Sequence, residues 1–195
     1  MAASRLALVG LLLKALAWLA PALAAWYFAS PFIDRAPAGL AAVAIRSAAG
    51  KVGAVEMNAG RVSYEITLAP PYRAGGKLPE AQVSLEANAR KYSFGLALFI
   101  ALALASPPPR RVVALAAGAF VVALVPPAFG IAFDVLRQLM GTPELRPYLD
   151  WGPGAREAVA LGFQFGSLLA PTLVPVACWL AANPALVPLM GGRRR

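Results

Sequence analysis

The chain has 195 residues and a net charge of +9, with 59% hydrophobic and only 14% charged residues. A soluble domain usually has about 25% charged residues, so this composition excludes a protein whose whole surface faces water. There is no histidine, and Cys178 is the single cysteine, which excludes a disulfide within one chain, a cysteine-only metal site and the usual Ser-His or Cys-His pairs. We therefore predict a membrane protein without catalytic residues, metal or cofactor.

The first apolar run covers residues 6–29 and predicts a transmembrane helix, because about 20 residues cross the hydrocarbon core. Lys14 interrupts it, but the long lysine stem can reach the headgroups. A signal peptide cleaved near Leu23-Ala24-Ala25 is the alternative. The run is longer than the usual apolar region of about 7–15 residues in such peptides.

Three further runs predict a second, third and fourth span. The run at residues 92–106 is short for a transmembrane span. It can still cross if Ala87–Ala89 and the stems of Arg90 and Lys91 extend the helix. Residues 112–133 contain Pro126-Pro127, where we expect a kink or an early end of the helix. The last run, residues 158–182, precedes a short basic tail at 183–195.

The charged residues are distributed unevenly between the segments that connect these runs. The N-terminus, the short Pro-Arg turn and the C-terminus carry only basic charge: Arg5, Lys14, Arg110, Arg111, Arg193, Arg194 and Arg195. All acidic residues lie in the other two connections: Asp34, Glu56, Glu65, Glu80, Glu86, Asp134, Glu144, Asp150 and Glu157. The positive-inside rule then predicts an inner-membrane protein with both termini in the cytoplasm. The positive charge is thus a topology signal, and no nucleic-acid partner is expected.

The connection at residues 30–91 predicts a small domain outside the cytoplasm, inserted between spans one and two. Residues 37–49 read as a helix with an apolar stripe. Three segments, 52–57, 61–68 and 82–88, read as strands of a mostly antiparallel sheet. The fold class is therefore a membrane-embedded four-span helix bundle with a small α+β insert. The second outer connection, residues 134–157, is shorter.

Four small residues recur at a spacing of four in the last run: Ala158, Gly162, Gly166 and Ala170. Such a stripe lets another helix approach closely. The neighbouring helix belongs either to this chain or to a different protein, and the sequence leaves both possibilities open. Gln164, Ser167 and Thr172 are expected to face the bundle, because polar groups in lipid need partners.

The candidates for function on the periplasmic face are Asp134, Arg137, Glu157 and Gln164, near the outer ends of the last two spans. Asp134 and Arg137 end the third run, and Arg156 and Glu157 precede the fourth. We expect them to form ion pairs and to end the helices. A carboxylate pair for hydrolysis, formed by Asp134 and Glu157, is the alternative, although no metal-ligand spacing supports it.

Several segments together resemble the exosortase H-associated membrane proteins, over nearly the whole chain and in order. The segments are Leu23–Tyr27, Asn88–Phe99 with its Phe94-Gly95 step, Phe129–Leu139, Glu157–Gly166 and Ala170–Pro175. The resemblance implies an accessory to an exosortase, a membrane enzyme that processes C-terminal sorting signals. Exosortases use a Cys, an Arg and a His, so this chain, without histidine, is not itself the exosortase.

The leading hypothesis is a non-catalytic accessory whose partners are the lipid bilayer and an exosortase or its sorted substrate. A membrane hydrolase or transferase is the second hypothesis. A third is an assembly subunit of an envelope transport system. The sequence does not identify a substrate or an oligomeric state.

Overall fold

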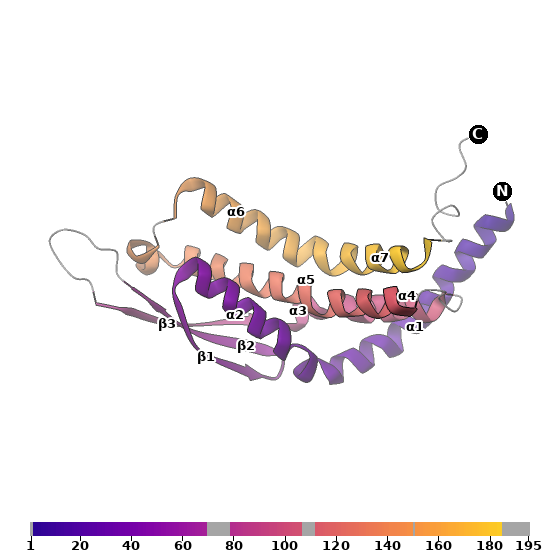
Figure 1. Ribbon diagram of the computed structural model, residues 1–195, viewed down its shortest axis with the longest axis horizontal. Helices are drawn as coiled ribbons and strands as arrows, with labels where there is room; N and C mark the ends of the chain where they lie inside the picture. The colour runs from indigo at the N-terminus through magenta and orange to yellow at the C-terminus, as the bar shows by residue number, and fades with distance from the viewer. Residues whose placement is uncertain (1, 70–78, 107–111, 150, 185–195) are drawn as a thin grey trace.

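The computed structural model describes residues 2–69, 79–106, 112–149 and 151–184. It is mostly helical, with one small sheet (Figure 1). In chain order the elements are α1 (Ala2–Ile33), α2 (Arg35–Ala49), β1 (Lys51–Asn58), β2 (Arg61–Leu68), β3 (Ala81–Asn88), α3 (Arg90–Ser93), α4 (Gly95–Ala105), α5 (Val112–Gly141), the 3-10 helix η1 (Pro143–Tyr148), α6 (Pro153–Gln164), the π-helical turn η2 (Phe165–Leu169) and α7 (Ala170–Ala182).

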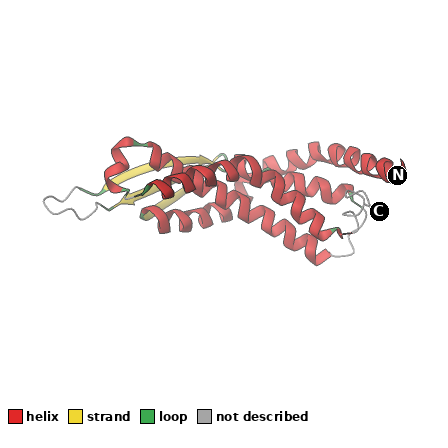
Figure 2. Ribbon diagram, turned by 90° about the horizontal axis from the view of Figure 1, so that it is seen from above, coloured by secondary structure: helices red, strands yellow, loops and turns green. Residues whose placement is uncertain are grey.

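The molecule is elongated, and its two ends differ. The sheet, α2 and η1 lie at one end, which we call the sheet end (Figures 1 and 2). The beginnings of α1 and α5 and the ends of α4 and α7 lie at the other, which we call the terminal end. Helix α5 and the α6–α7 pair run along the whole molecule, whereas α1 and α4 lie in its terminal half (Figure 1).

Three helices are long and apolar enough to cross a membrane, among the residues that the structure describes: Leu8–Ile33, Val112–Gly141 and Pro153–Ala182. The second apolar run forms the short α3 and the 11-residue α4, which is about 16 Å long at 1.5 Å per residue. A bilayer core is about 30 Å thick. The expected count of four spans is therefore reduced to three candidates, because α4 does not qualify by itself.

Helix α5 continues through Pro126 and Pro127 to Gly141, so an early end at the prolines is wrong. Both prolines are buried, and α5 packs along α7 on one side and α2 on the other. Each proline removes a backbone hydrogen bond, but burial of the helix on both sides offsets that loss. The helix that follows η1 begins at Pro153, before the expected residue 158, because Pro153 occupies a favoured first-turn position.

The predicted three-stranded antiparallel sheet is confirmed, with strand order β1-β2-β3. Val62, Tyr64, Ile66 and Leu68 of β2 are at most 1% exposed and face α2 and α5. The alternate residues of β2 and β3 make a polar outer face. A three-stranded sheet is marginal by itself, so its stability depends on the two helices that cover the inner face.

Candidate functional site: the junction around α3

The short helix α3 lies where the sheet, α1 and the long helices meet. Arg90, its first residue, donates a hydrogen bond from Nε to Ser30 Oγ of α1, 2.9 Å away. The guanidinium carbon lies 4.2 Å from the centre of the Tyr27 ring. A Cβ at Gly60, in the β1–β2 turn, would approach Arg90 Cδ to 2.9 Å. Arg90 therefore connects the end of α1 with the hairpin turn.

A buried carboxylate, Asp34, lies in the same junction between α1 and α2. Asp34 is fully buried, and neither carboxylate oxygen has a hydrogen-bond partner among the described residues. Burial raises the pKa of Asp34 from 3.8 to about 6, and the nearby Ser93 hydroxyl and the charge of Arg90 oppose this shift. Ser93 Oγ in turn accepts a hydrogen bond of 3.2 Å from Trp26 Nε1 of α1. A buried carboxyl without a full set of partners is unusual in a native fold and marks this junction as a candidate site.

The opposite side of α3 faces α5. Tyr92 is fully buried, and its ring fills the space that a Cβ on Gly130 would occupy. Its hydroxyl has no hydrogen-bond partner among the described residues, although the charge of Asp134 is close enough to act on it. Asp134 forms an ion pair of 3.3 Å with Arg137, one turn further along α5. The four residues of α3 thus connect two buried carboxylates.

Phe163 of α6 completes this region with two cations near its ring. Arg137 Cζ lies 4.3 Å and Lys91 Nζ 4.8 Å from the ring centre. Both side chains come from other elements, α5 and α3. The interaction of a cation with an aromatic face contributes about 0.5–1 kcal/mol at exposed sites, so Phe163 ties α6 to both elements.

Of the four small residues predicted for helix packing, three are buried within this chain and one is exposed. Gly162 lies against Phe133, and a Cβ on Gly166 would be 3.0 Å from the Cα of Gly130. Ala170 is 2% exposed. Ala158 is exposed.

The remaining predicted site residues are not gathered into one site. Asp134 and Arg137 pair as expected, but Glu157 is exposed on α6 and forms no ion pair among the described residues. Gln164 is exposed, so the expectation that it faces the bundle is wrong. Ser167 and Thr172 satisfy their hydroxyls locally, with carbonyls of the preceding helical turn. Cys178 is half-buried among apolar side chains, and Arg195 and the rest of the basic tail after Pro184 lie outside the described residues.

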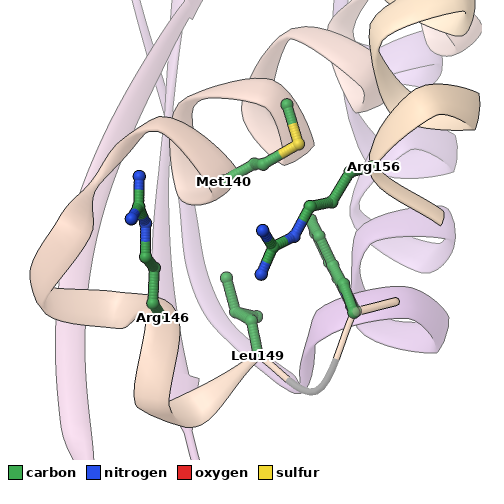
Figure 3. A pocket seen from close by; sticks show the side chains of 5 residues that line it. Met140, Arg146, Leu149 and Arg156 are labelled. Carbon is green, nitrogen blue, oxygen red and sulfur yellow. The ribbon is translucent and has the colours of Figure 1, made fainter. Parts of the chain in front are cut away.

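The cavities near the sheet end are small or open. One of about 10 Å³ is lined by Met140, Arg146, Leu149, Trp151 and Arg156, and Arg156 points toward Leu149 (Figure 3). That is about the space of one water molecule. A second, shallow hollow of about 320 Å³ lies on the outer face of the sheet between Gly53, Glu65 and Gln82. The described residues hold no cluster of three His, Cys, Asp or Glu that could bind a metal ion.

The junction residues Trp26, Ser30, Asp34, Arg90 and Ser93 were missed as site residues from the sequence. Each stands at the edge of an apolar run, where a polar residue is expected to mark a helix end. The signal was the position of Asp34 and Arg90, which are oppositely charged and directly flank the connection at residues 35–89. Sequence spacing alone could not predict that the charge of Arg90 acts on Asp34, because the two residues come near each other only through the fold of the sheet domain.

Fold and site define an integral membrane protein with apolar helices that carry a small α+β domain at one end, joined to them through α3. The family model of the exosortase H-associated membrane proteins matches residues 5–186. The chain belongs to this family. No curated protein and no solved structure matches the chain.

Proposed function

We propose that the protein is a non-catalytic accessory of an exosortase system, which holds the sheet domain at the outer surface of the bacterial inner membrane. Membership of the exosortase H-associated family is the observation that carries this proposal. The absence of histidine from the whole sequence supports a role without the catalytic residues of an exosortase.

The proposed topology has four crossings, both termini in the cytoplasm and the sheet end in the periplasm. Helix α4 begins beside α3, where the sheet meets the helices, and finishes at the terminal end (Figure 1). With α3 it spans residues 90–105, about 24 Å at 1.5 Å per residue. Charge supports this orientation, because the acidic residues all lie in the two connections assigned to the periplasm, while the N-terminus, the Pro-Arg turn and the C-terminus carry only basic charge.

The junction around α3 supports a positioning role for the domain. Arg90 binds α1 and contacts the hairpin turn, while Tyr92 packs on α5. Because α3 is held on both sides, the sheet is fixed in one orientation above the helices. The surface that it presents is the polar outer face of β2 and β3, where the exosortase or its sorted substrate would bind.

Co-purification in mild detergent tests the proposal. Wild type is expected to recover the exosortase or a sorted substrate, and Glu65→Arg on the outer sheet face is expected to reduce the yield. The matched control is Glu157→Arg, the same charge reversal at an exposed position of α6. Failure of wild type to recover either partner, or equal loss in both variants, would contradict the proposal.

The alternative, a membrane hydrolase or transferase, makes a different prediction for Asp134. As a catalytic carboxylate it would be required for function, so Asp134→Asn would abolish the phenotype at an unchanged membrane level. The accessory proposal expects this variant to keep partner recovery as long as the protein folds. Measuring the phenotype and the partner recovery for Asp134→Asn therefore distinguishes the hydrolase from the accessory protein.

A further inference from the structure

Lys91 and Arg137 form a pair of basic residues on the surface. They lie where the exposed side chains of the helices change from apolar to polar. Lys91 is exposed, and the side chain of Arg137 is 46% exposed. They come from α3 and α5, and both lie within 5 Å of the centre of one ring, Phe163. Two like charges held near one ring repel each other, and a bound anion would relieve this repulsion.

The charges within the protein do not fully neutralise this pair. Asp134 is the acidic partner of Arg137, at 3.3 Å, and its own side chain is largely buried on the inner side of α5. Lys91 has no carboxylate within 4.0 Å among the residues that the structure describes. The region therefore keeps an excess positive charge on its exposed side.

The pair lies at the boundary between apolar and polar surface. Toward the terminal end the exposed side chains are apolar, for example Val125 of α5, Ile100 of α4 and Leu168 of η2. Toward the sheet end, α5 and α6 expose polar groups such as Arg156 and Glu157. The headgroup layer of a bilayer occupies such a boundary, and basic residues there attract anionic lipids.

From this geometry we propose that Lys91, Arg137 and Phe163 form a binding site for the headgroup phosphate of an anionic phospholipid. The phosphate lies between the ammonium and guanidinium groups, each of which donates hydrogen bonds to it. Phe163 holds both cations beside one ring, and the acyl chains extend along the apolar surface toward the terminal end. The site does not depend on the accessory role, because it needs only a bilayer.

Native mass spectrometry of the full chain tests the site, after extraction from vesicles of equal parts phosphatidylglycerol and phosphatidylcholine. Wild type is expected to retain phosphatidylglycerol in preference. Lys91→Gln combined with Arg137→Gln is expected to lower that preference about tenfold. Arg35→Gln is the matched control, because Arg35 is a single basic residue beside one ring, that of Phe32.

Single substitutions of Lys91 test the site independently of the double variant. If the double variant does not fold, Lys91→Gln alone removes a cation without breaking an ion pair, and it should still reduce the preference. Lys91→Arg should retain it. The proposal is overturned by an equal preference in wild type and variant, by an equal loss in Arg35→Gln, or by displacement of the lipid with inorganic phosphate alone. None of these outcomes bears on recovery of an exosortase.

Discussion

Arg90 of α3 donates a hydrogen bond of 2.9 Å from Nε to Ser30 Oγ, near the end of α1. The two residues are 60 positions apart, and the entire sheet domain lies between them in the sequence. This bond therefore closes the domain at its base. It fixes where the sheet sits relative to the first helix, on which the proposed positioning role depends.

Arg90→Ala is expected to destabilise the protein by about 2 kcal/mol, from the lost hydrogen bond and the lost contact with Tyr27. The thermal midpoint in detergent and the rate of proteolysis of the sheet domain measure this. Arg61→Ala is the control: Arg61 pairs with Glu86 at 3.5 Å on the exposed sheet face, where ion pairs contribute about 0–1 kcal/mol. Equal effects of the two variants would contradict a special role for Arg90.

Asp34 predicts a dependence of stability on pH. Its pKa in the folded protein, about 6, lies above the ordinary 3.8, so the folded state binds the proton more tightly than the unfolded state. Stability should therefore fall as the pH rises from 3.8 to 6 and then stay at the lower level, with a total loss of roughly 3 kcal/mol at most. Thermal midpoints measured below pH 3.8 and above pH 6 test this.

Asp34→Asn should abolish this dependence and raise stability at neutral pH, because the neutral amide carries no desolvated charge. Glu65→Gln, at an exposed position, is the control and should change neither quantity. Retention of the full pH dependence by Asp34→Asn would show that another group causes it.

Gly95 tests how closely α4 approaches α7. A Cβ there would overlap the carbonyl oxygen of Pro171 and lie 2.9 Å from Pro175 Cγ. A backbone carbonyl cannot move aside as a flexible side chain can, so Gly95→Ala should cost about 1–3 kcal/mol. Gly154→Ala, where no atom lies within 4 Å, is the matched control and should be neutral or stabilising. A harmless Gly95→Ala would mean that α4 packs more loosely than described.

The proposed orientation can be tested with thiol labelling, because Cys178 is the single native cysteine. In a Cys178→Ala background, Ser84→Cys on the sheet should react with an impermeant maleimide once the outer membrane is permeabilised. Pro184→Cys, just after α7 at the terminal end, should react only after the inner membrane is also disrupted. Both positions are exposed. The reverse labelling pattern would indicate the opposite orientation in the membrane. Labelling of both cysteines in intact spheroplasts would contradict the proposed four crossings.

The sheet could be predicted because its signal is local. In β2, Val62, Tyr64, Ile66 and Leu68 alternate with polar residues, and this period of two appears unchanged as buried and exposed faces. The ends of α5 and α6 could not be predicted well. Both helices extend beyond the apolar runs, because α5 packs on α2 and the two helices pack on each other outside the apolar region. Hydropathy detects lipid contact and does not detect that packing.

The site was predictable only where its partners are close in sequence. Asp134 and Arg137 are three residues apart on one helix, so their pairing follows from helical geometry. Arg90 and Ser30, or Trp26 and Ser93, meet only through the tertiary fold. The misassignment of Gln164 has a related cause. The small residues beside it set the packed face of the helix, and Gln164 lies two residues from both Gly162 and Gly166, on the other side.

Site-specific photo-crosslinking in cells tests the central claim most directly. A photoreactive amino acid at Ser84, on the outer sheet face, should crosslink to the exosortase or to a sorted substrate. The same probe at Phe120, an exposed apolar position of α5, should crosslink to lipid in preference. If Ser84 captures neither protein while the chain is present at its normal membrane level, the sheet does not serve as the docking surface and the accessory account is contradicted.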